Sequence, residues 1–311
     1  MTQQSTAART AALVVPSPWR TTLTVTGKDR LTWLNGLVTC DLAKRAPGDA
    51  VYGLFVAKNG RVLADVAVVV DETRVLLSVP ASQAEALRAH LDHYLIMEDA
   101  EIARSADESG TFGVYAVHGP RARDVLAAVR TAGGVGGELD RTGLGGAIVL
   151  AGKERERDVR AALERVVAEV GGAFGDERAW DALRLERAVP RFGIDFDGAT
   201  YPQEAGLEKT SVSFSKGCYL GQEVVCMLEM RGKVKRKLVA LALDSGSVPP
   251  RGTTVTAVDG ANAGEITSAT ASPTLGGTVA LAMVKAAQIE PGTVLDVGGT
   301  RATVVALPSG S

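Results

Sequence analysis

The sequence is poor in cysteine and has no long apolar run. Three cysteines in 311 residues are an odd and sparse set, which argues against a disulfide framework and favours a reducing compartment. The longest aliphatic stretches, 66–70 and 238–243, are strand-sized and far short of the about 20 residues that cross a bilayer. The polar N-terminal segment 1–9 does not resemble a signal peptide. We therefore expect a cytoplasmic protein with no membrane partner.

Excess charge and metal-binding patterns are also lacking. The net charge is −2, so nothing indicates contact with duplex DNA over the whole surface. His90, His93 and His118 lack metal-ligand spacing, and we assign them no role. No phosphate-binding glycine loop is present. These absences predict no metal site and limit any nucleic-acid role to a local patch.

The N-terminal two thirds alternate short strands with helices. Strands are predicted at 23–25, 66–70 and 75–79, and the clearest helix at 82–94, where Ser82 can cap the first turn. A weak repeat aligns 24–27 with 116–119, each a strand that ends in glycine before a helix-compatible run. Two related α/β halves follow from this repeat. The glycine-rich segment 133–146 is predicted to be a loop without chemistry.

The composition changes after Lys237. Strand-like segments separated by glycine and proline, with no helical pattern between them, indicate a small β-barrel or sandwich. These segments are 238–243, 253–258, 278–284 and 301–307. We therefore predict an α+β protein with a folded region over 1–237, divided into two ferredoxin-like halves at roughly 1–110 and 111–237, and a β-barrel over 238–311.

One segment, 216–237, is dense in reactive and charged groups. It holds Cys218, Cys226 and six cations within 22 residues, which packing alone does not require. Cations near Cys218 could lower a thiol pKa and favour thiolate chemistry, whereas the alternative is a small buried core residue. The spacing of Cys226 from Cys218 fits neither a metal knuckle nor a redox dithiol.

Four separated motifs, in the expected order, resemble known proteins over nearly the full length. The run from Lys216 to Glu223 with Arg231-Gly232 resembles the YgfZ family of folate-binding proteins, which is related to the aminomethyltransferase (T protein) of the glycine cleavage system. The other matching stretches are Gly27–Asp41 with Asn59–Asp65, Ala182–Glu186 with Pro190–Gly193 and Pro202–Leu207, and Gly264–Ser268 with Ser272–Gly276.

The resemblance implies a ring of three domains around a channel that binds tetrahydrofolate. The YgfZ branch is associated with maintaining or repairing iron-sulfur cluster enzymes, including those that modify tRNA, so client enzymes or assembly proteins would be partners. The T protein branch transfers an aminomethyl carbon to tetrahydrofolate. The cysteine motif favours the first function, and folate-dependent one-carbon transfer is the alternative.

The resemblance also suggests site residues. Cys218 and Asp65 would be catalytic, Asp65 by stabilising charge at the folate nitrogens. Glu204 would pair with the pterin ring, because a carboxylate accepts two parallel N–H bonds. Tyr219 and Gln222 belong to the same motif and are expected to contact the cofactor.

Two departures from the relatives stand out. Cys226 and Met227 replace the Ala-Arg that YgfZ relatives usually carry, and Ala64 precedes Asp65 where the T protein has paired acids. The second departure places aminomethyl transfer in more doubt than folate binding.

The cations that follow the motif allow three interpretations. They could hold the glutamate tail of folate, since arginine suits bidentate carboxylate recognition. They could also bind RNA phosphates in a tRNA-modification accessory protein, or simply protect a strand edge. The residues concerned are Arg231, Lys233, Lys235, Arg236 and Lys237.

Overall fold

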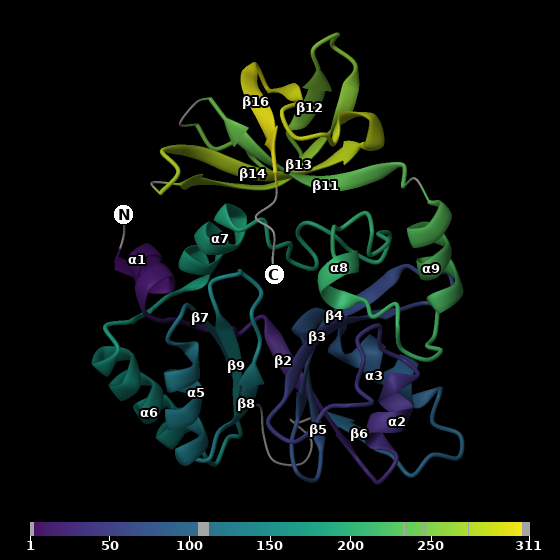
Figure 1. Ribbon diagram of the computed structural model, residues 1–311, viewed down its shortest axis with the longest axis vertical. Helices are drawn as coiled ribbons and strands as arrows, with labels where there is room; N and C mark the ends of the chain where they lie inside the picture. The colour runs from purple at the N-terminus through teal and green to yellow at the C-terminus, as the bar shows by residue number, and fades with distance from the viewer. Residues whose placement is uncertain (1–2, 105–111, 233, 245–246, 273, 307–311) are drawn as a thin grey trace.

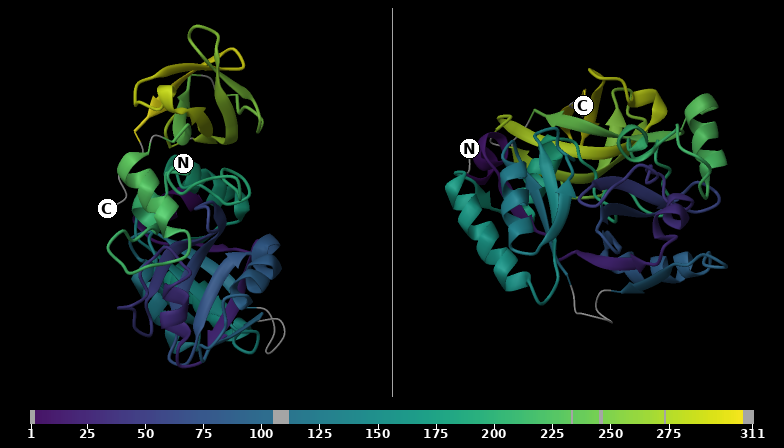
Figure 2. Two further views of the ribbon diagram at one scale, coloured as in Figure 1. Left: turned by 90° about the vertical axis from the view of Figure 1, so that its right-hand side faces the viewer. Right: turned by 60° about the horizontal axis from the view of Figure 1, so that its bottom comes forward.

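The computed structural model describes residues 3–104, 112–232, 234–244, 247–272 and 274–306. Two α/β halves lie side by side and a β-barrel stands over them, as Figure 1 and the left view of Figure 2 show. This architecture confirms the predicted α+β class with a C-terminal barrel. Among the described residues, no helix has the length and apolar character needed to cross a membrane.

The first half contains a five-stranded sheet with two helices on one face. Leu34 from the first helix and Leu87 and Leu91 from the second pack against strand residues in one core. In sheet order the strands are β3 (Ala50–Val56), β4 (Val62–Val70), β5 (Val75–Pro80), β2 (Arg20–Thr26) and β6 (Glu101–Arg104), and the helices are α2 (Arg30–Asn35) and α3 (Ala84–Asp92).

The second half repeats this plan around a second sheet. In sheet order its strands are β10 (Ala173–Phe174), β1 (Leu13–Pro16), β7 (Gly113–His118), β9 (Gly146–Ala151) and β8 (Val135–Glu138), with α5 (Ala122–Thr131) and α6 (Glu156–Glu169) packed on it. Strand β1 pairs with both β7 and β10, and α1 (Gln3–Thr10) packs beside β10. The N-terminal segment thus belongs to the second half, so the expected division at residue 110 is wrong for it. A strand added from a distant part of the chain leaves no local signal.

The two sheets pack against each other by their other faces. Because side chains alternate along a strand, Val66 and Val68 of β4 enter the first core while Ala67 and Val69 face Val114 of β7. Burial on both faces explains why β4 is an almost continuous apolar run.

The sequence repeat corresponds to equivalent turns in the two halves. Gly27 after β2 and Gly119 after β7 have φ angles of 94° and 122°, and each precedes a helix of its half. An added Cβ would approach Asp99 O to 2.2 Å at Gly27 and Ala11 O to 2.5 Å at Gly119. Only glycine fits such a position, and the paired strand, glycine and helix pattern is confirmed.

The C-terminal barrel is closed by six antiparallel strands. They are β11 (Arg236–Leu243), β14 (Gly277–Lys285), β13 (Asn262–Ser272), β12 (Thr254–Ala257), β15 (Val294–Val297) and β16 (Thr300–Val305) in barrel order. The sequence predicted four of them. Strand β13 escaped notice because its small and polar residues lack strong alternation, and β15 was also missed.

Two local predictions need correction. Helix α3 begins at Ala84 after a short 3-10 turn, η1 (Ala81–Gln83), so exposed Ser82 does not cap it. The segment 133–146, expected to be a plain loop, contains β8 and, after that strand, a bend that carries Arg141. Three helices, α7 (Glu177–Glu186), α8 (Glu208–Ser211) and α9 (Gln222–Arg231), lie between the halves and the barrel.

Candidate functional site

A cavity of about 240 Å³ lies between the two halves, where the packed faces of the sheets separate. Its floor continues the apolar interface, with Ala67 from the first half and Val114 and Ile148 from the second. The segment after α7, Pro190–Ile194, closes one side. Such clefts between domains, apolar with a few polar groups, are the usual place for small-molecule ligands.

Flat side chains and cations line this cavity together. The Trp180 ring stacks on His118 with centroids 4.6 Å apart and planes 6° from parallel. Arg191 lies over the Trp19 ring at 4.4 Å. Aromatic walls with nearby guanidinium groups suit a planar heterocycle that also carries negative charge.

Asp65 is the only acid among the described residues that line the cavity. It sits on the face of β4 turned toward the second half, and its side chain is 6% exposed. Arg20 Nη1 donates to Oδ2 at 3.0 Å and Tyr52 Oη donates to the same oxygen at 3.1 Å. Burial raises the pKa of Tyr52, with the Asp65 charge adding to this, so the phenol keeps its proton. The two oxygens of a carboxylate can accept more hydrogen bonds than those from Arg20 and Tyr52, so Asp65 can still accept a hydrogen bond from a ligand.

The neighbouring position explains one departure from the relatives. Ala64 faces the opposite side of β4 and is fully buried in the first core. A second acid there would place an unpaired carboxylate among apolar side chains, which is costly. The cavity therefore receives one hairpin acid in this chain, Asp65.

A second cavity of about 350 Å³ adjoins the first and is more polar. The two share the lining residues Tyr52, Leu139, Arg141 and Pro190, so together they can take an elongated ligand. Arg141 lies 3.3 Å from the Tyr52 ring centroid, and Arg187 lines the second cavity beyond it. The backbone N–H groups of residues 142, 143 and 145 donate to nearby Asp140, so they offset its charge.

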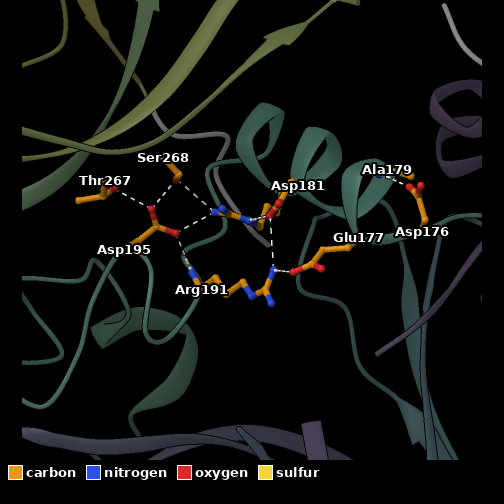
Figure 3. A network of polar contacts seen from close by, with 9 residues as sticks. Asp176, Glu177, Ala179, Asp181, Arg191, Asp195, Thr267 and Ser268 are labelled. Atoms are coloured by element: carbon orange, nitrogen blue, oxygen red, sulfur yellow. Dashed lines mark hydrogen bonds and ion pairs between the residues drawn. The ribbon is translucent and has the colours of Figure 1, made fainter. Parts of the chain in front are cut away.

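A buried polar network fixes the segment that carries Arg191 (Figure 3). Arg184 Nη1 donates to Asp195 at 2.7 Å, and both side chains are almost fully buried. Thr267 of β13 donates to Asp195 at 2.6 Å, and the backbone N–H of Arg191 donates to it at 2.9 Å. Glu177 accepts from the Arg191 guanidinium. The network joins α7, the cavity wall and the barrel.

Two residues expected to bind the cofactor pair with each other instead of facing this cavity. Glu204 is buried beneath the start of β11, where Arg236 Nε donates to its Oε1 at 3.3 Å. Its other oxygen accepts from the backbone N–H of Tyr201. Neither Glu204 nor Arg236 belongs to the lining of the two cavities between the halves. Contact of Glu204 and Arg236 with a folate stays a prediction, and their position outside the two cavities does not support it.

Most of the 216–223 motif has a structural task. The buried Lys216 ammonium donates to the carbonyl oxygens of Asn35, Val38 and Cys40 at 2.7 to 2.8 Å. Tyr219 packs in an apolar cluster, and burial raises its pKa. These contacts join the motif to the loop after α2 in the first half.

The turn into α9 uses the rest of the motif. Gly221 has φ 79°, and an added Cβ would lie 2.4 Å from Ala57 O. The Gln222 side chain accepts from the backbone N–H of Tyr219 at 3.3 Å. Cys218 is exposed, as Gly217 and Glu223 are, and none of residues 216–223 lines either cavity. The motif therefore combines an exposed thiol with residues that support the scaffold.

The cations after the motif are partly paired. Lys237 donates to Glu208 at 2.9 Å, as Arg236 does to Glu204. Arg231, the last residue of α9, is exposed, and Lys233 lies outside the described residues. The group therefore does not form one free patch.

Comparison with known proteins gives a consistent result. Residues 1–134 match the GCVT N-terminal domain, and residues 236–309 match the glycine cleavage T-protein C-terminal barrel domain. A protein of Thermotoga petrophila named aminomethyltransferase is 30% identical over 84% of this chain and 74% of its own. The chain belongs to the glycine cleavage T-protein family. The aminomethyltransferase of Herpetosiphon aurantiacus is 29% identical over 91% of this chain and 82% of its own.

A solved structure of a T-protein family member supports the fold. The glycine cleavage system aminomethyltransferase T from Bartonella henselae superposes with a TM-score of 0.81 and 21% identity, covering 98% of this chain and 88% of that one. The family-level resemblance predicted from the sequence is thus confirmed, whereas these matches do not distinguish the YgfZ branch.

Several residues that line the cavity between the halves of the present chain were not predicted as site residues from the sequence. They are Tyr52, His118, Arg141 and Trp180. A signal existed for His118, which follows Val114 and Ala116 on one face of β7 and so places a polar ring on an apolar face. Among the described residues, no group of three or more metal-ligating side chains could hold a metal ion.

Proposed function

We propose that this protein binds a reduced folate in the cavity between its two halves. The observation that carries the proposal is the position of Asp65, the single acid among the described lining residues, in a cavity walled by aromatic rings and arginines. A pterin presents an amino group and a ring N–H side by side, which one carboxylate can accept together. Asp65 keeps acceptor capacity for such a pair beyond its bonds with Arg20 and Tyr52.

The adjoining polar cavity supports the same ligand. A folate carries a glutamate tail whose carboxylates need cations, and Arg141 and Arg187 lie along the second cavity. We assign the tail to these arginines. Arg231 and Arg236, the residues that the sequence suggested for this task, lie outside both linings.

Aminomethyl transfer to the folate is the reaction that the relatives' names favour. Tetrahydrofolate would supply the nitrogen that accepts the one-carbon unit. Because Arg20 and Tyr52 already donate to Asp65, we assign this residue the tasks of orienting the heterocycle and offsetting positive charge. Arg20 of β2 holds the carboxylate and is itself positioned by Ser78 of β5, because Arg20 Nε donates to Ser78 Oγ at 3.0 Å.

The YgfZ-type role is a second candidate use of the folate. The observation in its favour is that Cys218 is exposed while Lys216, Tyr219 and Gly221 around it serve the scaffold. Such an accessible thiol would act in maintaining iron-sulfur enzymes, including those that modify tRNA. The RNA-binding reading has less support, because Arg236 and Lys237 are already paired with acids.

Titration with tetrahydrofolate under anaerobic conditions tests the binding proposal. Two of the three tryptophans, Trp19 and Trp180, line the cavity, so saturable quenching of intrinsic fluorescence should accompany binding. We expect Asp65→Asn to weaken binding at least tenfold. The matched control is Asp71→Asn, which removes a hairpin carboxylate that pairs with Arg74 outside the cavity lining and should leave affinity unchanged. Absence of binding by the unaltered protein would overturn the proposal.

The two uses of the folate are separable by Cys218→Ser. If the protein is an aminomethyl transferase, it forms methylenetetrahydrofolate from an aminomethyl donor with release of ammonia and the protonated carrier, and the serine variant does so equally well. If its task is the maintenance of iron-sulfur enzymes, the serine variant fails to restore their activity in a strain that lacks the native protein, while its folate affinity stays normal.

A further inference from the structure

His118 presents two buried nitrogens to the cavity without a partner. It is the last residue of β7 and is 3% exposed. Neither Nδ1 nor Nε2 has a hydrogen-bond partner within the described part of the chain. The same residue lines the cavity between the halves. The proposed function uses Asp65 and the arginines and leaves His118 without a task.

Unmet nitrogens of this kind call for an explanation. Buried side-chain polar atoms in native proteins nearly always have a partner, and leaving one unmet is costly. The ring of His118 cannot easily turn to find another partner, because Trp180 stacks against its face and β7 fixes its backbone. A ligand in the cavity would supply the hydrogen-bond partner that the two nitrogens of His118 lack.

The ring is neutral at physiological pH. Burial lowers the pKa of His118 to about 4, the Asp140 charge opposes this shift, and Arg141 adds to it. A neutral imidazole has one N–H donor and one acceptor nitrogen. His118 therefore offers an uncharged hydrogen-bond donor and acceptor, whereas Asp65 is a charged acceptor and the arginines are charged donors.

We propose that His118 is a ligand-binding residue that donates a hydrogen bond to an acceptor atom of the heterocycle held in the cavity. The inference rests on the proposed folate site and deepens it. Asp65, which comes from the first half, can only accept, so it serves the N–H groups of a pterin. His118 comes from the second half and serves a carbonyl oxygen or ring nitrogen of the same ligand. Recognition by both halves would make the ligand a bridge between them.

Two variants and one control test this role. His118→Phe keeps an aromatic ring against Trp180 and removes both nitrogens, whereas His118→Gln keeps one donor and one acceptor. We expect the phenylalanine variant to bind tetrahydrofolate about tenfold more weakly and the glutamine variant to recover part of the loss. The control is His93→Phe, which changes an exposed histidine outside the cavity lining.

A spectroscopic readout separates a binding role from a structural one. In protein labelled with ¹⁵N-histidine, His118 is identified by the signal missing in His118→Phe, or in the glutamine variant if the former does not fold. Added tetrahydrofolate should move this signal, while those of His90 and His93 stay in place. If the unaltered protein binds tetrahydrofolate but the His118 signal does not move, or His118→Phe binds as tightly, the His118 inference alone is overturned. If the unaltered protein does not bind, the folate site and the inference fall together.

Discussion

Loss of Asp195 should destabilise the protein far more than loss of its neighbour Asp181. Both carboxylates accept from Arg184, whose side chain is 1% exposed, but Asp195 is fully buried and Asp181 is 35% exposed. Asp195→Ala leaves a buried guanidinium without its buried partner, and breaking such a pair costs about 3–5 kcal/mol. Asp181→Ala removes a partly exposed partner and leaves the buried pair intact, so we expect about 1 kcal/mol.

The effect should reach the cavity as well as overall stability. Asp195 also accepts from Thr267 of the barrel and from the backbone N–H of Arg191 (Figure 3). Asp195→Ala should therefore loosen the Pro190–Ile194 wall and weaken tetrahydrofolate binding, whereas Asp181→Ala should change affinity little.

Urea unfolding followed by tryptophan fluorescence measures the difference in unfolding free energy. A double variant, Arg184→Met with Asp195→Leu, gives an internal check, because replacing both partners by apolar residues leaves no lone buried charge and should recover much of the loss. Equal costs for Asp195→Ala and Asp181→Ala, or a cost below about 1 kcal/mol for the former, would refute the reasoning.

Three further predictions concern stability. Lys216→Met leaves three carbonyl oxygens without their charged donor. It should lower the unfolding free energy, measured by urea titration, by about 3 kcal/mol. A loss under about 1 kcal/mol would show that the ammonium does not anchor this segment. Gly221→Ala should lower the thermal midpoint, because its Cβ would meet Ala57 O, while Gly217→Ala, with nothing within 4 Å, should not. For His118 the folded-state pKa of about 4 lies below the ordinary 6.5, so the unfolded chain binds the extra proton first and stability falls as the pH drops from 6.5 toward 4, by up to about 3 kcal/mol. His118→Phe should show a smaller acid loss, and an unchanged pH dependence would contradict this assignment.

Local patterns were sufficient to predict the class of the fold and some of its elements. The apolar run of β4, the paired turns at Gly27 and Gly119, and the strands separated by glycine in the barrel all follow from spacing and residue type. The insertion of β1 into the second sheet could not be predicted in this way, because strand pairing across more than 90 residues has no local signature.

The site was harder to predict, because its residues meet only after folding. The dense motif looked like one site, yet Lys216 reaches back about 180 residues to the loop after α2, and Glu204 turns to Arg236. Conversely, His118 and Trp180 were assigned no site role from the sequence, and their rings stack against each other in the cavity. Asp65 was predicted from the resemblance to the T protein, with its place in a strand after a turn in agreement, and the structure places it in the cavity lining.

The affinity of Asp65→Asn for tetrahydrofolate, compared with that of Glu204→Gln, tests the central claim most directly. Each variant replaces a buried, arginine-paired carboxylate by an amide, but Asp65 alone lines the cavity between the halves. We predict at least a tenfold loss of affinity for Asp65→Asn and less than a twofold change for Glu204→Gln, by calorimetric titration. The reverse result, with Glu204→Gln losing affinity and Asp65→Asn retaining it, would contradict the account and move the folate to the side of the molecule where Glu204 meets the barrel.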